Sequence, residues 1–265
     1  LLSKSVVKND KFDSRGNTLH SVRTNYDDKD NVIDITDITS KKFDSRGNVL
    51  EQTVVSMDDK GKVSSSTDIA NSNYDTRGNA RLVVRTTKDD KGKVVDIQET
   101  KNLAFDVRGN VLSQVITTKD PAGKIQGIVE VTNKDYNVRG VAGETVRVNK
   151  DDQGKLIDSQ KILNKKTDFR GNVLEQTVIN YDKDGKKIGS TDIVNSNYNS
   201  RGNAAKTTRI NRDENDEIIE RQEIANNAFD FDDLIEKTVK IFQDHHIHGR
   251  SVRSGAPAPT VRRLP

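Results

Sequence analysis

The chain has 265 residues, of which 31% are hydrophobic and 32% are charged, and it contains no cysteine. Counting the 17 Gly as apolar and leaving out the 5 Tyr gives an apolar share of roughly 35%, against about 45–50% in average globular proteins, which excludes a large three-dimensional core. The 44 basic and 41 acidic residues are interspersed and leave a net charge of +3, too little for a field that draws in nucleic acid or an anionic membrane, and the absence of cysteine excludes disulfides and thiol chemistry.

The first recurring element is a turn, spelled FDSRGN at 12–17 and 43–48 and YDTRGN at 74–79. Its copies follow one another at a constant step of 31 residues, without an insertion. The Asp, Arg and Gly residues of this turn motif are Asp13, Arg15, Gly16, Asp44, Arg46, Gly47, Asp75, Arg77, Gly78, Asp106, Arg108, Gly109, Arg139, Gly140, Asp168, Arg170, Gly171, Arg201 and Gly202. Asn137 and Asn199 replace the Asp in two copies, and Asp230 marks a degraded eighth copy. Periods in this range are typical of stacked supersecondary units.

Each unit contains a second turn. Asp59-Lys60-Gly61-Lys62-Val63 recurs around Gly92, Gly123, Gly154 and Gly185. An Asp-x-x-Gly sequence suits a type I turn followed by a residue with positive φ, because the Asp side chain accepts turn amides and Gly has no Cβ to clash. Such turns commonly close β-hairpins.

Short segments rich in Val, Ile and Thr lie between the turns, such as VLEQTVVSM at 49–57, and they favour strand over helix. The segment DDLIEKTVKIFQD at 232–244 has helical spacing, but it aligns with NVLEQTVINYD at 172–182 after a one-residue deletion, and we predict a strand. The predicted fold is all-β. An array of about eight 31-residue two-strand units spans 1–244, beginning in the middle of a repeat, and forms an elongated antiparallel meander or a β-solenoid. A basic, Pro-containing tail follows at 245–265.

Stacked repeats place equivalent positions side by side, so two rows of side chains are expected. The aromatic row is Phe12, Phe43, Tyr74, Phe105, Tyr136, Tyr198 and Phe229, and the Asn row is Asn71, Asn102, Asn133, Asn164, Asn195 and Asn226. Aromatic side chains bury area that a thin sheet otherwise lacks, and Asn side chains bond their neighbours or tie off a turn. We expect both rows to be structural.

The Arg column of the turn motif has two interpretations. The guanidinium groups can make charge-assisted hydrogen bonds across neighbouring turns, in which case exposed ion pairs of about 0–1 kcal/mol each would set register more than stability. They can also present a cationic stripe to a polysaccharide or an acidic surface polymer. We favour the pairing.

No catalytic, cofactor or metal site is predicted. The acidic turns Asp27-Asp28-Lys29-Asp30 and Asp182-Lys183-Asp184-Gly185 lack the distal Glu of a calcium loop, and their Lys opposes a cation. The cluster His245, His246 and His248 is expected to belong to a disordered end rather than to bind a transition metal. A catalytic site needs one unique constellation of groups, so the repetition argues against an enzyme.

The sequence [Phe/Tyr]-[Asp/Asn]-x-Arg-Gly-Asn-x-Leu, as in FDSRGNVL at 43–50 and FDVRGNVL at 105–112, resembles the YD repeats of RHS and teneurin-type proteins. The resemblance covers residues 1 to about 244. It implies β-hairpins that wind into a spiral shell on a large secreted or cell-surface protein, in some members around a toxin. Asn17, Asn48, Asn79, Asn110, Asn172 and Asn203 stand where the family usually has Arg.

The two ends of the array are in register with the repeat, because Leu1 aligns with Val63 and Val7 aligns with Ile38. The chain therefore opens just after its second turn, and its last strand stops near Asp244, just before that same turn. One hypothesis is that residues 1–9 of one molecule pair with about 234–243 of the next by β-strand addition. The residues expected at this junction are Leu1, Leu2, Val7, Ile235, Val239 and Ile241. The competing interpretation is a fragment of a longer array.

The functional expectation is a non-enzymatic, extracellular or cell-surface structural protein without cofactors, which assembles head to tail into a filament, sheath or stalk. The expected partners are further copies of the chain, with a cell-surface polysaccharide as the alternative partner, and no nucleic acid. No apolar stretch approaches the roughly 20 residues that span a bilayer, so membrane insertion is not expected. The alternatives are a glycan-binding adhesin and part of a shell that encloses a toxin.

Overall fold

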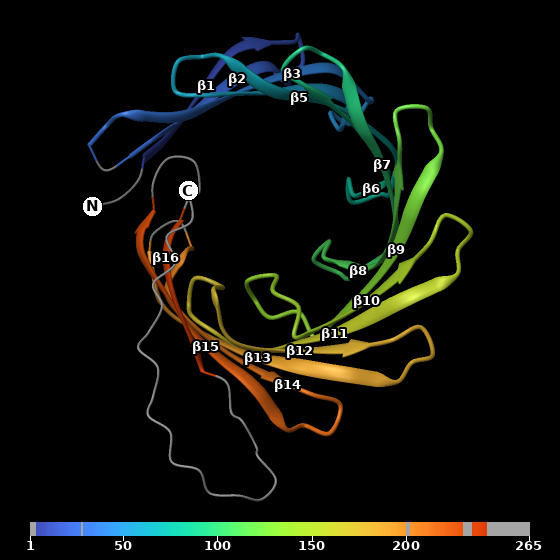
Figure 1. Cartoon of the computed structure of the whole chain (residues 1–265). Helices are drawn as coiled ribbons and strands as arrows, with labels where there is room; N and C mark the ends of the chain where they lie inside the picture. The colour runs from blue at the N-terminus through green and yellow to red at the C-terminus, as the bar shows by residue number, and fades with distance from the viewer. Residues whose placement is uncertain (1–3, 28, 200–201, 230–234, 243–265) are drawn as a thin grey trace, which may run out of the picture. The chain divides into compact units, whose positions relative to one another are not determined.

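The structure, a computed structural model, describes residues 4–27, 29–199, 202–229 and 235–242, with the backbone alone for 227–229 and 235–242. In these ranges the chain consists of strands joined by turns (Figure 1). The strands are β1 (Lys4–Phe12), β2 (Thr18–Tyr26), β3 (Val32–Phe43), β4 (Val49–Met57), β5 (Val63–Tyr74), β6 (Ala80–Asp89), β7 (Val94–Phe105), β8 (Val111–Lys119), β9 (Ile125–Lys134), β10 (Glu144–Lys150), β11 (Leu156–Thr167), β12 (Val173–Tyr181), β13 (Lys187–Tyr198), β14 (Ala204–Arg212), β15 (Ile218–Phe229) and β16 (Ile235–Phe242). No helix long and apolar enough to cross a membrane occurs in this part of the chain.

The strands follow one another in a 16-stranded sheet in chain order, from β1 to β16. Pairing is antiparallel from β1 to β9 and from β12 to β16. The predicted all-β repeat array is therefore confirmed, and the consecutive order is that of a meander. The strand predicted within 232–244 is β16.

The two turn types alternate along this order, so they lie at opposite ends of the strands. From β1–β2 to β13–β14, the turns that join an odd strand to the following even strand contain the Asp-x-Arg-Gly motif or its Asn variant, and we call their side of the sheet the Arg-Gly edge. Turns that join an even strand to the following odd strand contain Asp-x-x-Gly or a variant of it, and they form the Asp-Gly edge. The repeated turns therefore give each edge one chemistry.

The Asp-Gly edge shows how the turn sequence produces its geometry. Oδ1 of Asp58 accepts hydrogen bonds from the backbone N–H of Lys60 and Lys62 at 3.0 and 2.8 Å. The N–H of Gly61 reaches the carbonyl of Asp58 at 3.1 Å, and Gly61 has a φ of +78°. In this region a residue with a Cβ is strained, which explains the Gly at this position.

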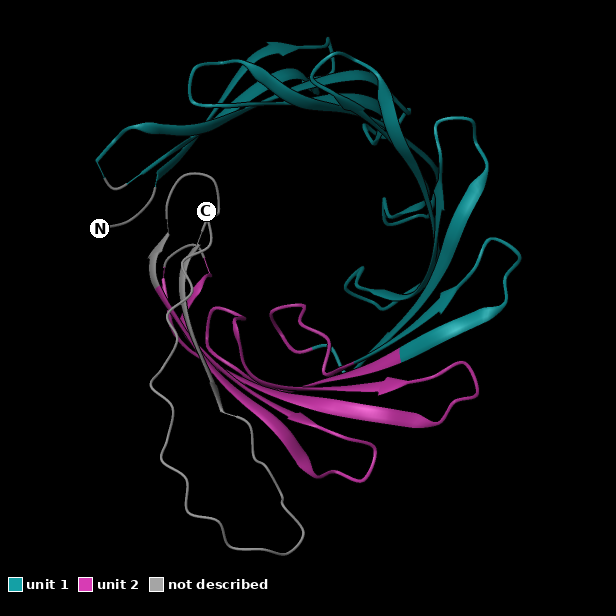
Figure 2. Cartoon of the chain, in the orientation of Figure 1, with its two compact units in different colours: residues 1–136, 145–159 teal, residues 137–144, 160–265 magenta. Residues whose placement is uncertain are grey.

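The chain divides into two compact units, one of residues 1–136 and 145–159 and the other of 137–144 and 160–265 (Figure 2). The first contains β1 to β9, most of β10 and the start of β11, and its sheet is strongly curved in Figure 2. The second contains the end of β11 and β12 to β16. The division of the chain into two compact units was not predicted from the sequence.

Burial confirms that the sheet has little core. Among the residues whose side chains are described, Ile224 is the one apolar side chain classed as buried, at 8% exposure. Most strand residues are half-buried, and from β1 to β9 and from β12 to β16 the contacts between strands are those of neighbours in the sheet. Stability must therefore come from contacts between adjacent strands and adjacent turns rather than from a packed interior.

Candidate functional site

The repeated feature with the most organised chemistry is the Arg-Gly edge, and the turn at Asp44 shows its construction. Oδ1 of Asp44 accepts from the backbone N–H of Arg46 at 2.8 Å and of Asn48 at 2.9 Å. Its Oδ2 accepts from Nδ2 of Asn48 at 2.8 Å. The carboxylate is thus occupied by its own turn. These hydrogen bonds, first that of the Asn48 side chain, hold the pKa of Asp44 below its usual value.

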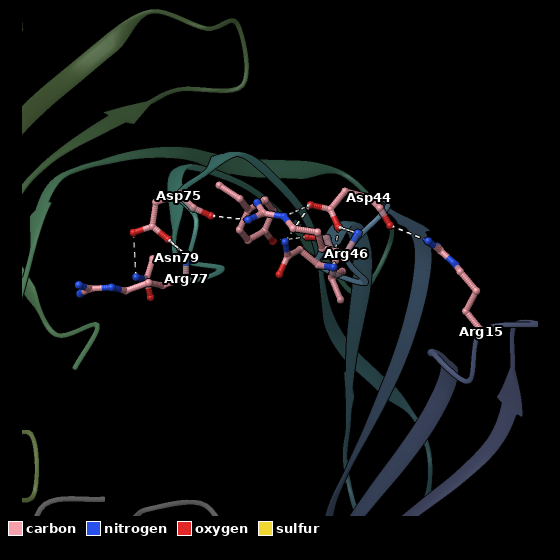
Figure 3. Close-up of polar contacts among 9 residues, drawn as sticks. Arg15, Asp44, Arg46, Asp75, Arg77 and Asn79 are labelled. Atoms are coloured by element: carbon pink, nitrogen blue, oxygen red, sulfur yellow. Dashed lines mark hydrogen bonds and ion pairs between the residues drawn. The ribbon is translucent and has the colours of Figure 1, made fainter. Parts of the chain in front are cut away.

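The arginines connect one turn to the next (Figure 3). Nη1 of Arg15 donates to the backbone carbonyl of Asp44 at 2.9 Å, and Nη1 of Arg46 donates to that of Asp75 at 2.9 Å. Arg77 continues the series to the carbonyl of Asp106 at 3.1 Å, and Arg108 reaches the carbonyl of Tyr136 with Nη2 at 2.9 Å. All four bonds lie inside the first unit.

These contacts are charge-assisted hydrogen bonds between neighbouring turns, and their acceptor is a backbone carbonyl rather than a carboxylate. Within each turn, the closest approach of the arginine Nε to the Asp carboxylate is 3.6 Å for Arg15 and 3.9 Å for Arg46, which is longer than a hydrogen bond. Each of these four guanidinium groups is therefore anchored by one N–H to the next repeat, and those of Arg15, Arg46 and Arg108 also lie beside the carboxylate of their own turn.

The Asn that follows each Gly makes the second contact between turns. A Cβ built on Gly47 would lie 2.9 Å from Oδ1 of Asn17, and one on Gly109 would lie 2.9 Å from Oδ1 of Asn79. The Gly thus serves two purposes, positive φ and close approach of the preceding turn. In the copy with Val141 in place of this Asn, the methyl group of Val141 lies against Gly171 instead.

The predicted Asn row ties the ends of the strands together. Nδ2 of each Asn donates to a backbone carbonyl 22 residues earlier, at the start of an even strand or, for Asn164, two residues before it. The pairs are Asn71 with Val49 (3.0 Å), Asn102 with Ala80 (2.8 Å), Asn133 with Val111 (2.9 Å), Asn164 with Ala142 (2.8 Å), Asn195 with Val173 (3.1 Å) and Asn226 with Ala204 (2.6 Å).

The aromatic row joins the Asn row in the repeats that have Tyr. The hydroxyl of Tyr136 donates to the Val111 carbonyl at 2.6 Å, the same oxygen that accepts from Asn133. Tyr74 and Tyr198 repeat this contact at Val49 and Val173. Phe43 and Phe105 are half-buried, whereas Phe12, on β1, is 55% exposed.

A row of carboxylates that was not predicted from the sequence lies on one face of the sheet. Asp68 on β5 accepts from Thr53 on β4 at 2.5 Å and pairs with Lys88 on β6 at 2.6 Å. The cation and the hydroxyl lower the pKa of Asp68 to about 2. Glu99 pairs in the same way with Lys119 at 2.9 Å, and Glu130 with Lys150. The signal was present, since Asp37, Asp68, Glu99, Glu130 and Asp192 fall in one column of the repeat.

His20 on β2 contacts Asp37, the member of this row nearest β1. Its Nδ1 lies 2.6 Å from the carboxylate of Asp10 on β1, and its Nε2 lies 3.0 Å from that of Asp37 on β3. The two carboxylates, first Asp37, raise the pKa of His20. One imidazole group therefore bridges three strands.

Several predicted residues lie outside the described part of the chain. Leu1, Leu2, Arg201, the 245–265 tail and its histidines are among them, and for Phe229, Ile235, Val239 and Ile241 only the backbone is described. Val7, the other predicted junction residue, lies on β1 and is 56% exposed. In the described residues no group of three or more His, Cys, Asp and Glu side chains could hold a metal ion.

No model of a protein family and no curated protein matches the sequence. Two of the solved structures that are similar to this chain are the crystal structures of TcdB2-TccC3-Cdc42 and TcdB2-TccC3. The first is 12% identical to this chain with a TM-score of 0.20, and the matched region covers 84% of this chain and 16% of the chain in that structure. The second is 11% identical to this chain with a TM-score of 0.18, and the matched region covers 91% of this chain and 19% of the chain in that structure. The chain thus spans less than a fifth of these structures, and at these TM-scores the likeness carries no argument about its fold or function.

Proposed function

We propose that this chain is a structural repeat protein whose sheet is extended by further copies of itself through β-strand addition. The observation that carries the proposal is the open edge at β1. In the described chain β1 pairs with β2 alone, whereas its counterpart in the next repeat, β3, pairs with both β2 and β4. Within the described residues, the side of β1 that faces away from β2, here called its free side, has no paired strand.

The side chains of β1 support an added strand. Every residue of β1 is exposed, including Val6 at 41% and Val7 at 56%. Natural sheets protect an edge with proline, bulges or charge. β1 has Lys4, Lys8 and Lys11, and bulges beyond Asn9, but it has no proline, and Lys4 to Asn9 pair with β2 in regular register. This regular half is the segment on which a strand would add.

The repeat itself supplies the kind of strand that fits. An odd strand is flanked by even strands, so the free side of β1 is complementary to an even strand. β16 is even and pairs only with β15 in the described chain. A contact between β1 of one copy and β16 of another joins two different surfaces, and such heterologous contacts propagate unless the geometry closes. The expected product is a filament, and, in line with the resemblance to YD repeats, its place is at the cell surface or outside the cell.

Proline substitutions test the junction. Successive N–H groups of a β-strand point to opposite sides, so of Val6→Pro and Val7→Pro one removes a bond to β2 and the other removes an N–H from the free side. The variant changed on the free side should keep the melting temperature of the parent and stop assembly in sedimentation velocity. A parent chain that stays monomeric at every concentration, or a full-length filament from both folded variants, contradicts the proposal.

Mixing distinguishes heterologous from symmetric contact. The variant blocked at β1 is mixed with a second variant blocked at β16, namely whichever of Val239→Pro and Lys240→Pro leaves the pairing with β15 intact. Each should be monomeric alone, and the two should form a one-to-one dimer when mixed, because each has one intact edge. Dimers of the β16-blocked variant on its own would instead indicate pairing of β1 with β1. A fluorescence-detected sedimentation experiment with differently labelled variants measures both outcomes.

A further inference from the structure

The arginines of the first unit form a regular row of exposed cationic groups. Arg15, Arg46, Arg77 and Arg108 occur once per repeat, and two strands separate each from the next. Adjacent strands lie about 4.8 Å apart, so successive arginines start roughly 9–10 Å apart along the edge. The hydrogen bond from each guanidinium group to the next turn restricts the conformations of the arginine side chain, so the row is preorganised for a ligand.

Most of the hydrogen-bonding capacity of these arginines is unused. A guanidinium group has five N–H donors. Arg46 donates one of them, through Nη1, to the carbonyl of Asp75 at 2.9 Å. Its Nε lies 3.9 Å from Asp44, and its side chain is 46% exposed. The remaining N–H donors of this exposed side chain suit a carboxylate or sulfate, which guanidinium binds in a bidentate manner.

The acidic partner does not cancel this charge at the surface. The carboxylates of Asp13, Asp44 and Asp106 are 20–23% exposed, whereas the arginine side chains beside them are 45–48% exposed. The oxygens of each carboxylate are also occupied by the Arg and Asn of its own turn. An approaching anion therefore meets guanidinium first, although the chain as a whole has a net charge of only +3.

The spacing selects the class of polyanion. Phosphates follow one another about every 3.4 Å along the axis per strand of a nucleic acid, much closer than the arginines. Single-stranded nucleic acids also bind on stacked aromatic side chains, but no aromatic residue stands directly before these arginines. Ser14, Ser45 and Thr76 precede the first three, and the exposed Val107 precedes Arg108. Two sugar rings of an extended polysaccharide span about the distance between successive arginines, and hydroxyl side chains suit a sugar.

We infer that the Arg-Gly edge of the first unit binds a linear acidic polysaccharide, with one carboxylate or sulfate at each arginine and the chain of sugars running along the row of turns. This interaction does not depend on the strand addition proposed above, because it uses turns within one copy. Assembly would only lengthen the row.

The full-length chain carrying the free-side proline substitution in β1 is the material for the test, so that binding is measured without assembly. Its affinity for immobilised hyaluronate, which has one carboxylate on every second sugar, is compared with its affinity for neutral dextran and for single-stranded DNA. We expect saturable, salt-sensitive binding to hyaluronate, no binding to dextran and weaker binding to DNA. The double variant Arg46→Gln/Arg77→Gln should lose about tenfold in affinity, and Arg46→Lys/Arg77→Lys should retain part of it.

The matched control is Lys60→Gln/Lys91→Gln, which removes the same charge from exposed residues of the Asp-Gly edge. It should leave the affinity within about twofold, because at physiological ionic strength charges beyond about 8 Å are largely screened. Circular dichroism melting of each variant shows that it is folded. No hyaluronate binding, an equal loss in the control, or DNA bound as tightly as hyaluronate would each overturn the inference. Filament formation is measured separately and is unaffected by any of these results.

Discussion

Asn48 and Gly78 are in contact across successive turns: a Cβ built on Gly78 would lie 3.0 Å from Oδ1 of Asn48. Gly78 also has a φ of +85°. The substitution Gly78→Ala therefore introduces both backbone strain and a collision, and we expect it to destabilise the fold by about 2 kcal/mol. Denaturation in urea measures the loss.

Gly92→Ala is the matched control for that substitution. Gly92 has nearly the same φ, +79°, but no atom lies within 4 Å of its would-be Cβ. It should cost about 1 kcal/mol, the strain alone. The difference between the two variants isolates the contact between turns, and equal losses would show that this contact contributes nothing.

A second prediction concerns the bonds from arginine to the next turn. Arg46→Met keeps the aliphatic stem but removes the donor to the Asp75 carbonyl, and we expect a loss of about 0.5–1.5 kcal/mol in the free energy of unfolding. Arg85→Met removes an exposed arginine from the middle of β6 and should change stability by less than about 0.5 kcal/mol. If both variants are equally stable, the bond between turns has no energetic value.

The turn carboxylates predict how stability depends on pH in acid. The pKa values of Asp13, Asp44, Asp75 and Asp106 are lowered in the folded chain, mainly by hydrogen bonds from Asn side chains. A lowered pKa contributes stability that is present above the unfolded value of about 3.9 and is lost as the pH falls through the folded value. Unfolding by urea should become progressively easier below about pH 4.

Asp44→Asn tests this dependence with little change in turn geometry, because Asn already stands at this position in two turns of the chain, at Asn137 and Asn199. Oδ1 of Asn137 accepts from the backbone N–H of Arg139 at 2.9 Å and of Val141 at 3.0 Å. The variant should be less stable than the parent at neutral pH, and the difference should disappear as the parent carboxylate becomes protonated. A difference that stays constant between neutral and acidic pH would contradict the prediction.

His20 predicts the opposite dependence at the β1 end of the sheet. Asp37 and Asp10 raise its pKa, so the stability that the imidazolium contributes is complete below its unfolded pKa of about 6.5 and is lost as the pH rises through the higher folded value. Lys8 and Lys11 on β1 lie near the same carboxylate of Asp10. Hydrogen exchange corrected for intrinsic rates should show β1 opening more readily at alkaline pH, and His20→Gln should remove this change.

The repeat made much of the fold predictable, because each turn has a local chemistry that sequence displays. Asp58 and Gly61 define their turn by side-chain acceptance and positive φ, and neither depends on distant contacts. The strand at Ile235–Phe242 was recognised by alignment to an earlier copy, although its own spacing suggested helix. Local chemistry and a fixed period were sufficient for these elements.

The contacts that could not be predicted depend on register and on groups that sequence does not display. The acceptor of Arg15 is a backbone carbonyl, which every residue has, so no pattern of side chains pointed to Asp44. Asp68 on β5 pairs with Lys88 on β6, 20 residues later. In the register of these strands Lys88 lies opposite Ser66 and Asp68 lies opposite Thr86, so the partner is diagonal and follows from the strand register. The column of acidic residues can be seen in the sequence, but the lysines and the hydroxyl group that pair with them cannot.

One irregular copy also escaped prediction. The Arg139 turn is followed by Val141-Ala142-Gly143 instead of Asn, Val and Leu, and β10 begins only at Glu144 and has 7 residues, against 9 in β8 and β12. The boundary between the two compact units passes through this region. A missing Asn in the repeat was the available signal, but its effect on strand length required the structure.

Because the contacts between strands from β1 to β9 and from β12 to β16 are those of neighbours in the sheet, and Ile224 is nearly alone in being buried among the described side chains, tension applied at the two termini has no common interior to break. Load would be released one hairpin at a time, starting from an outer strand and progressing inward. Under mechanical stretching such a chain should lengthen in small, nearly equal steps at low force and should form its hairpins again when the force is removed. It would therefore behave as an extensible tether rather than as a domain that unfolds in one step.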